Sequence, residues 1–244
     1  MKVPKLVQIA LAVMLYVALF LFIITQLADV LDFSTLFESR SRLLKGALLT
    51  LGLSLASLVS SMILGFLIFL MTESVNVFLK TTAGIYKEII MGTPLLVLVF
   101  VVVYIIGVAL GIHNKMMLGF LALTLYMSPY MTNIFDGAYK SISRNQFMVM
   151  DFYGFNLYQK YRYIILPQMI RPLIPGLINN LSAIIKGTSI LSTIAIADIF
   201  YTTQVLSNNS YRYIEGYFVL WMVYLLITIP LSMLAKYLSR QEIY

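Results

Sequence analysis

The sequence predicts an all-α membrane protein that crosses the bilayer six times. Hydrophobic residues make up 61% of its 244 residues and charged residues only 11%, whereas about a quarter of an average soluble domain is charged. Six apolar stretches are long enough to cross a bilayer core of about 30 Å as helices. Both observations argue against a soluble domain built around one core.

The first apolar stretch runs from Leu6 to Ala28 without a charge, directly after Lys2 and Lys5. A signal peptide has a hydrophobic region of about 7 to 15 residues, closed by a small-residue cleavage pattern. This stretch is longer and ends without that pattern, so we expect an uncleaved transmembrane helix. Residues 1–42 would comprise this helix and an external linker.

Five further stretches make up the main membrane domain, which we place at residues 43–240. They run over Leu43–Met71, Ile89–Leu110, Lys115–Phe135, Leu173–Phe200 and Tyr217–Leu238. The first of them carries small residues typical of closely packed membrane helices, at Gly46, Gly52, Ser54, Ser57, Ser60, Ser61 and Gly65.

The basic residues orient these spans, because Lys and Arg accumulate in cytoplasmic loops. One side of the predicted topology carries Lys2, Lys5, Lys80, Lys87, Lys140, Arg144, Lys160, Arg162, Arg171, Lys236 and Arg240. The other side carries Arg40, Arg42, Lys45, Lys115 and Arg212, and Lys186 falls inside a span. The excess places both termini in the cytoplasm. It also accounts for the net charge of +7 without a nucleic-acid partner.

The longest cytoplasmic loop, residues 137–172, contains a short amphipathic helix. Asn156 followed by Gln159 is a helix-start signal, and Pro167 is expected to end the helix. Apolar residues share one face, at Leu157, Tyr161, Ile164 and Ile165. Gly154 can supply a turn with positive φ. Such a helix either lies on lipid headgroups or docks on a partner protein.

Four short motifs resemble those of the permease subunits of ATP-binding cassette importers, in particular importers of polar amino acids. They are Gly154 with Tyr161 and Ile165-Leu166-Pro167-Gln168, GTPLLV at Gly92–Val97, ALTL at Ala122–Leu125, and KGTSIL at Lys186–Leu191. The motifs follow the family's order, and the resemblance covers roughly residues 45–238. It implies a type I importer permease fold with one extra N-terminal helix, in a bacterial plasma membrane.

The resemblance implies a transport subunit and not an enzyme. Two permease subunits, identical or different, would form a path for a polar amino acid, together with two cytoplasmic ATPase subunits and an extracytoplasmic substrate-binding protein. This chain would bind no cofactor, and ATP-Mg would bind to the ATPase. The loop helix would be the coupling helix that contacts the ATPase, through Gly154, Leu157, Tyr158, Tyr161, Ile165, Leu166 and Pro167.

The sequence departs from the family pattern mainly at charged positions. Met148-Val149-Met150 and Asp151 stand where the family has Glu-Ala-Ala and a following Arg. Further departures are Met91 for an Arg, Asn133 and Asp136 for a Glu and an Arg, and Gly187 for an Asp.

The fifth span is the most polar, and it contains Lys186. Lys186 lies 11 residues beyond Pro175, or about 16 Å along a helix. An ammonium at that depth is costly and marks a functional site by default, while Gly187 indicates an interrupted helix that lines a cavity. Lys186 either reaches toward the interface or a neighbouring carbonyl, or it holds a substrate carboxylate. The predicted path residues are Lys186, Thr188, Ser189 and Asn133.

Gly92, Thr93 and Pro94 form a candidate gate or hinge at the start of the third span. Proline removes a helical hydrogen bond and glycine frees the backbone, although Pro94 is equally suited to a simple helix entry. Asp198 and Glu215 flank an external loop. They either meet a binding protein or are solvated, and we expect them to be solvated.

Several other activities lack the residues they require. The chain has no cysteine and a single histidine, His113, so it can form neither a disulfide nor a cysteine- or histidine-based metal cluster. It also lacks a Gly-rich phosphate loop and a Gly-x-Ser-x-Gly motif. An ATP-independent secondary transporter or channel is the alternative. Such transporters often show internal repeats and carboxylates deep within spans, and the sequence shows neither.

Overall fold

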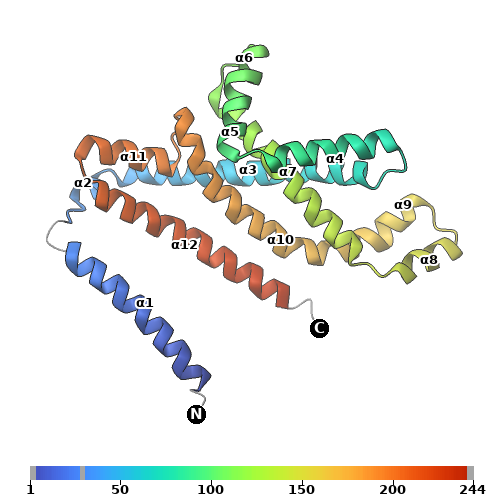
Figure 1. Ribbon diagram of the computed structural model, residues 1–244, viewed down its shortest axis with the longest axis horizontal. Helices are drawn as coiled ribbons and strands as arrows, with labels where there is room; N and C mark the ends of the chain where they lie inside the picture. Colours follow the sequence, from blue (N-terminus) through green and yellow to red (C-terminus); the bar gives the residue numbers. More distant parts are fainter. Residues whose placement is uncertain (1–3, 28–30, 241–244) are drawn as a thin grey trace.

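The computed structural model describes residues 4–27 and 31–240, and within these ranges the chain forms helices joined by short connections (Figure 1). The α-helices are α1 (Lys5–Leu27), α2 (Ser34–Glu38), α3 (Arg40–Thr72), α4 (Val77–Gly92), α5 (Leu95–Phe100), α6 (Gly107–Ala109), α7 (Lys115–Lys140), α8 (Arg144–Phe152), α9 (Leu157–Gln159), α10 (Leu166–Gly187), α11 (Ile199–Ser210) and α12 (Tyr213–Arg240). Two π-helical turns, η1 (Val101–Ile106) and η2 (Lys160–Ile165), and a 3-10 helix, η3 (Thr188–Ile194), continue some of them.

The predicted spans appear as straight helices and as bent pairs. Three helices in the described ranges, α1, α3 and α12, are long and apolar enough to cross a membrane alone. Two bent pairs also qualify: α4 with the helix over 95–109, bent by 109°, and the helix over 157–194 with α11, bent by 49°. The remaining predicted span lies in α7, whose 26 residues are long enough. α7 is less apolar because most of one face packs on other helices, not on lipid.

α3 and α7 pack closely along one another at the centre of the molecule. A Cβ atom on Gly65 would lie 2.5 Å from the Cβ of Met131, so only glycine permits this approach. The Thr132 hydroxyl donates a 3.0 Å hydrogen bond to the Gly65 carbonyl across the same contact. The prediction of close packing along the small residues of this span is therefore confirmed at Gly65 and at the buried Ser54, Ser57 and Ser61.

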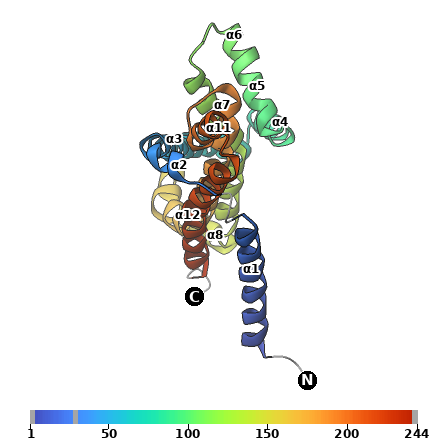
Figure 2. The ribbon, with the colours of Figure 1, turned by 90° about the vertical axis from the view of Figure 1, so that its left-hand side faces the viewer.

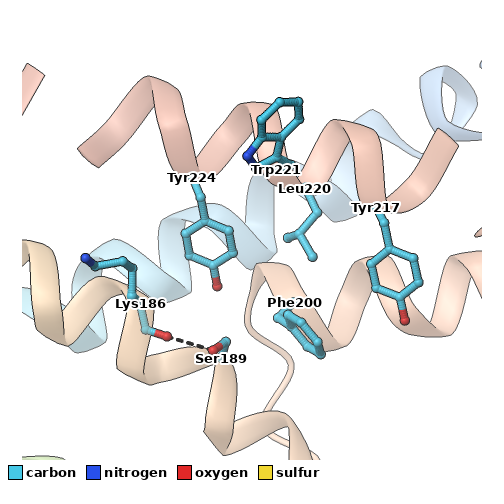
Figure 3. Close-up of a pocket in the computed structure, with 7 residues that line it drawn as sticks. All are labelled: Lys186, Ser189, Phe200, Tyr217, Leu220, Trp221 and Tyr224. Carbon is cyan, nitrogen blue, oxygen red and sulfur yellow. Dashed lines mark hydrogen bonds between the residues drawn. The ribbon is translucent and has the colours of Figure 1, made fainter. Parts of the chain in front are cut away.

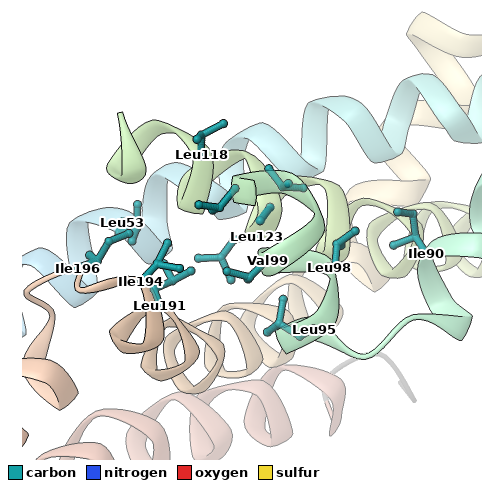
Figure 4. Packing of buried hydrophobic residues seen from close by; sticks show 13 residues of the cluster. Leu53, Ile90, Leu95, Leu98, Val99, Leu118, Leu123, Leu191, Ile194 and Ile196 are labelled. Atoms are coloured by element: carbon teal, nitrogen blue, oxygen red, sulfur yellow. The ribbon is translucent and has the colours of Figure 1, made fainter. Parts of the chain in front are cut away.

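Two apolar clusters fill the interior. The first gathers α5, the first part of α7 and η3 around Val99, Leu123 and Leu191 (Figure 4). The second lies between α3, α7 and the start of α10, around Phe69, Met131 and Ile165. Each cluster joins helices that are far apart in the sequence, so packing fixes where the breaks in the helices lie.

α1 stands apart from the other helices, beside α12 (Figures 1 and 2). None of the membrane-spanning stretch of α1 is buried against the rest of the described chain. Its contact with α12 is aromatic: the Phe20 ring lies 6.4 Å from that of Phe218 and 6.2 Å from that of Trp221. The division at residues 42 and 43 remains a prediction, and in the structure α3 already begins at Arg40.

Two of the sequence predictions about helix ends are wrong. The third span is not one helix over Ile89–Leu110, because α4 ends at Gly92 and the chain turns sharply before α5 begins at Leu95. Pro167 does not end the loop helix, because that helix continues through η2 into α10. Proline lacks the backbone N–H that an α-helix uses. The π turn directly before Pro167 already departs from α-helical hydrogen bonding, so the missing donor does not end the helix.

Candidate functional site

Lys186 lies where α10 ends. The α-helix stops at Gly187 and tightens into η3, which closes at Ala195 in a left-handed conformation with φ of 61°. The α-helix thus ends near Gly187 as predicted, but the chain is not interrupted there, because it continues in helical form to Ile194. The Lys186 side chain is exposed, while its backbone carbonyl accepts a 2.7 Å hydrogen bond from the Ser189 hydroxyl. Two of the predicted path residues therefore lie one helical turn apart.

A cavity of about 280 Å³ opens between the end of α10, α11 and α12 (Figure 3). Six of its seven lining residues supply aromatic, aliphatic or hydroxyl surface, and the seventh is the only cation. They are Lys186, Ser189, Phe200, Tyr217, Leu220, Trp221 and Tyr224. Lys186 is therefore the one cation among the lining residues, and its exposed side chain lies at the edge of a largely apolar cavity.

The other two predicted path residues lie outside this cavity. Thr188 is fully buried, and its hydroxyl donates to the Ile185 carbonyl at 2.8 Å. Asn133 belongs to a second cavity, of about 480 Å³, between α3, α4 and α7. That cavity is also lined by Thr72, Lys80, Gly84, Lys87, Glu88 and Met91. The structure therefore brings Lys186 and Ser189 together but separates Asn133 from them.

The segment Gly92-Thr93-Pro94 forms the sharp bend between α4 and α5. Thr93 has an extended backbone, and its hydroxyl donates a 2.7 Å hydrogen bond to the Ile89 carbonyl. Pro94 directly precedes the first residue of α5. Asn133 contacts Met91 beside this bend, with 3.9 Å between Nδ2 and Sδ. The bend itself is observed, and its role as a gate remains a prediction.

The broken span also touches the end of α10. A Cβ atom on Gly187 would lie 3.2 Å from Cδ2 of Leu95, which is the first residue after the bend. Because Gly187 has no side chain, Leu95 can pack directly against the helix that carries Lys186. Leu95 therefore places the bend in contact with the end of α10.

The loop over residues 137–172 contains α8, which the sequence analysis missed. Met150 of α8 is buried, and Phe147 packs on Tyr139 of α7 with 5.4 Å between the rings. These apolar residues at i and i+3 are the signal that could have found the helix. Lys160 forms an ion pair with Asp151 and ties the start of η2 to the end of α8.

Gly154 turns the chain between α8 and α9 with φ of 65°. The predicted helix start is confirmed: Asn156 and Gln159 exchange two hydrogen bonds of 2.9 Å between their side chains and backbone N–H groups. Leu157 and Tyr158 are 73% and 68% exposed. Phe152 and Tyr153, on the other side of the turn, are also exposed. We call these four residues the loop tip.

The other predicted coupling residues are less available to a partner. Ile165 is only 1% exposed and packs into the second apolar cluster, which Tyr161 also contacts. Leu166 is half-buried and Pro167 is exposed. The apolar face predicted along this helix is therefore divided, because its later part packs against its own chain.

Asp198 and Glu215 are not solvated, contrary to the sequence prediction. They are 0% and 3% exposed. The Oδ1 atom of Asp198 caps α11 by accepting a 2.8 Å hydrogen bond from the Tyr201 N–H. Glu215 accepts a 2.9 Å bond from the Asp32 N–H and lies 3.5 Å from Arg212. Each carboxylate has a packing role that residue spacing alone does not reveal.

Comparison with known proteins identifies a family and relatives that this chain resembles. Residues 61–243 match the family model described as "Binding-protein-dependent transport system inner membrane component". The Bacillus subtilis protein "Probable glutamine ABC transporter permease protein GlnM" is 30% identical over 86% of this chain and 98% of its own. The nopaline transport system permease protein NocM of Agrobacterium fabrum is 29% identical, over 84% of this chain and 89% of its own.

Solved structures show the same fold. The crystal structure of an amino acid ABC transporter with histidines contains a chain that is 26% identical, with a TM-score of 0.79 over 86% of this chain and 99% of that one. An inward-facing structure of the MetNI methionine ABC transporter gives a TM-score of 0.68 at 15% identity, over 82% of this chain and 98% of that one.

Proposed function

The chain belongs to the family of binding-protein-dependent transport system inner membrane components, and we propose that it forms the path by which an importer admits a polar amino acid. Members of this family are the membrane subunits of ATP-driven importers, whose ATP is hydrolysed by a separate subunit. The proposed amino-acid substrate rests on the similarity to GlnM and to the amino acid transporter with histidines.

The observation that carries this proposal is the Lys186 cavity. Lys186 is an exposed cation at the edge of apolar walls, and the attraction between an ammonium and a carboxylate is stronger beside such walls than in bulk water, because the dielectric constant is lower there. The contact between Gly187 and Leu95 connects this cavity to the bend at Gly92-Thr93-Pro94. In the proposed path, Lys186 and Ser189 contact the substrate, Thr188 supports them from behind, and the bend acts as the gate beside Asn133.

The proposed partners are a second permease subunit, two cytoplasmic ATPase subunits that bind ATP-Mg, and an extracytoplasmic binding protein. The loop tip supports the contact with the ATPase, because clustered exposed apolar side chains at the end of a loop mark an interaction surface. The proposed setting is a bacterial cytoplasmic membrane with both termini in the cytoplasm, which the distribution of Lys and Arg supports.

Transport by a Lys186→Met variant tests the path. Methionine keeps an unbranched apolar side chain but removes the charge and the donors, so uptake of L-glutamine into proteoliposomes containing the ATPase and binding protein should fall at least tenfold. Lys236→Met is the matched control, since Lys236 is exposed near the end of α12. Unchanged uptake and unchanged amino-acid preference in Lys186→Met would favour a lysine that only reaches toward the membrane interface.

A Tyr158→Asp variant tests the loop tip. It places a charge in the exposed apolar surface without disturbing the buried residues, so binding of the ATPase to the permease should weaken severalfold while the permease stays folded. Tyr211→Asp is the control, because Tyr211 is an exposed tyrosine at the far end of α11, 82% exposed. Equal ATPase binding by wild type and Tyr158→Asp would leave the loop tip without this role.

A further inference from the structure

A proline inside α7 leaves one backbone carbonyl without its helical partner. Pro129 lies within α7, and proline has no N–H to donate to the carbonyl four residues earlier, which here belongs to Leu125. Membrane helices tolerate such prolines where side chains or neighbouring helices bind the freed carbonyl, because lipid offers no donor of its own. Pro129 therefore requires that another group donate to Leu125.

Two hydroxyls act as these donors, and one of them comes from a different helix. The Ser128 hydroxyl of α7 donates a 2.9 Å hydrogen bond to the Leu125 carbonyl. The Tyr86 hydroxyl of α4 donates to the same carbonyl at 3.1 Å and lies 2.8 Å from Oγ of Ser128. A backbone carbonyl has two lone pairs, so it can accept both bonds. α4 is thus bonded to α7 at the point where proline breaks the helical hydrogen bonds of α7.

α7 is itself fixed at this level by α3. The Ser128 carbonyl would lie 2.8 Å from a Cβ atom on Gly65, so the two helices touch there through backbone atoms. The Thr132 hydroxyl donates to the carbonyls of both Ser128 and Gly65 at 3.0 Å. The segment of α7 around Pro129 is therefore a firm support to which α4 can be anchored.

α4 has few other contacts that could set its position. Among the described residues, it contributes two buried side chains, Ala83 and Ile90. Four further residues of α4 line the cavity of about 480 Å³, namely Gly84, Lys87, Glu88 and Met91. Because this packing is sparse, the hydrogen bond of Tyr86 matters for where α4 lies. Tyr86 is also within two helical turns of Gly92, where α4 ends and the bend toward α5 begins.

Building on the proposed function, we infer that Tyr86 is a positioning residue for transport. Its hydroxyl takes the place of the N–H that Pro129 lacks and thereby anchors α4 to α7. The anchor holds the end of α4, and with it the bend at Gly92-Thr93-Pro94, in a defined place relative to α7. Without the hydroxyl, the Leu125 carbonyl keeps only the bond from Ser128, and α4 loses its link to the proline.

Tyr86→Phe tests the anchor, since it removes only the hydroxyl and keeps the ring, which packs on the first apolar cluster. A spin label on Ile89→Cys reports the mobility of α4, because Ile89 is 61% exposed and the chain has no other cysteine. In the purified permease–ATPase complex, Tyr86→Phe should make the label more mobile. Uptake of L-glutamine into proteoliposomes with the ATPase and binding protein should fall by about threefold to tenfold, the factor that one net hydrogen bond is worth.

Pro129→Ala distinguishes an anchor at the proline from a general loss of packing. Alanine restores the N–H that binds the Leu125 carbonyl within α7, so the Tyr86 hydroxyl becomes dispensable. Tyr86→Phe should therefore change label mobility and uptake much less in a Pro129→Ala background than in the wild-type background. Equal effects in both backgrounds would overturn the inference, because the hydroxyl would then act independently of the proline.

Tyr104→Phe is the matched control, because Tyr104 lies in η1 and is 54% exposed. It should match wild type in label mobility and uptake. Wild-type uptake in Tyr86→Phe would overturn the inference and leave the proposed function intact, even if the label became more mobile, because Tyr86 would then be a structural contact only. If Pro129→Ala does not fold, the comparison of Tyr86→Phe with Tyr104→Phe still decides. If wild type takes up no L-glutamine, the proposed function fails, and label mobility in the two backgrounds decides whether Tyr86 anchors α4.

Discussion

Directly before α12, Arg212 binds two carboxylates at once. Its Nη2 lies 2.7 Å from Oδ2 of Asp32 and its Nη1 lies 3.5 Å from Oε1 of Glu215. Asp32 belongs to the linker after α1, and its N–H donates to the same Glu215. Hydrogen bonds from Ser34, followed by the charge of Arg212, hold the pKa of Asp32 below its ordinary value of 3.8. This ion cluster fastens the linker to the turn between α11 and α12.

The lowered pKa of Asp32 predicts how this attachment responds to acid. A carboxyl whose folded pKa is depressed contributes stability that is complete above the unfolded value and lost as the pH falls through the folded value. Trp221 is the only tryptophan and packs on Phe20 of α1, so its fluorescence reports the attachment. We expect the emission to stay constant from pH 7 to about 4 and to change only below pH 3.8.

Asp32→Asn serves as the control, because it removes the charge that pairs with Arg212. Its emission at pH 7 should already differ from that of wild type, and its acid transition should be smaller. Since Asp32 and Arg212 are partly exposed, high salt should reduce the difference between the two proteins. A wild-type transition with a midpoint above pH 3.8 would contradict the role of Asp32.

Gly154 gives a second prediction at this scale. A left-handed conformation costs a residue with a Cβ about 1 to 2 kcal/mol, and nothing else crowds this position. Gly154→Val should therefore strain the turn before α9 and lower transport per ATP hydrolysed, while the membrane helices stay folded. Gly137→Ala is the comparison, because Gly137 lies in α7 with open space around it. It should leave coupling unchanged; identical coupling ratios in both variants would remove the role of Gly154.

Among the elements, the bent span α4–α5 and the end of α10 share the contact that joins the bend to the residues of the cavity. Leu95 begins α5 directly after the bend and belongs to the first apolar cluster. Gly187 ends α10 directly after Lys186. We therefore predict that a displacement of α5 changes the packing of the residue next to Lys186.

Gly187→Ala tests this contact. The added Cβ would lie 3.2 Å from Cδ2 of Leu95, tighter than an ordinary packing distance, so Leu95 must shift away. We expect transport to fall severalfold with little loss of stability, and Leu95→Val in addition to Gly187→Ala to restore much of it. Gly52→Ala, where a Cβ meets nothing within 4 Å, is the control. Independent, additive effects of the two substitutions would show that they do not interact.

The elements also show what local sequence signals can and cannot reveal. Asn156 and Gln159 predicted a helix start correctly, because a capping box is complete within four residues. The end of that helix at Pro167 was predicted wrongly, because α10 is stabilised by the burial of Met169 and Leu173, contacts that a local proline signal does not include. α4 was missed since its Lys80 and Lys87 resemble an ordinary cytoplasmic loop.

The candidate site was predictable only in part, for the same reason. Lys186 was found because a charge in an apolar stretch stands out in the sequence. Its neighbours Tyr217, Trp221 and Tyr224 come from α12, and aromatic residues in a membrane helix carry no local sign of the cavity they line. Asp198 was wrongly expected to be solvated. Its burial arises from the packing of η3 against α11, which the local sequence does not reveal.

For the whole molecule, α1 is the part whose role is hardest to explain by packing. It lies outside the matched family region, which begins at residue 61, and its span is 0% buried. Its aromatic contacts with α12 contribute about 0.5 to 1.5 kcal/mol per pair. A contribution of this size matters for positioning α1, and neither apolar cluster contains an α1 side chain.

The charges around α3 suggest that α1 matters for how the chain enters the membrane. In the proposed topology Arg40, Arg42 and Lys45 lie on the outer side, against the tendency of basic residues near the first span to stay in the cytoplasm. With α1 present, Lys2 and Lys5 hold the N-terminus in the cytoplasm and α3 must start outside. Without α1, the three basic residues would lead the first span and favour the opposite orientation.

Deletion of residues 1–27 should therefore invert a large fraction of the molecules. The chain has no cysteine, so Tyr158→Cys introduces a single label at the loop tip. An impermeant thiol reagent added to intact cells should not label it in the full chain and should label it after the deletion. Replacing Arg40, Arg42 and Lys45 by Gln in the deleted chain should again prevent labelling, because the basic charge that favours the inverted orientation is gone. Labelling of Tyr158→Cys in the full chain would overturn the proposed topology, whereas protection in every variant would mean that α3 to α12 orient themselves without α1.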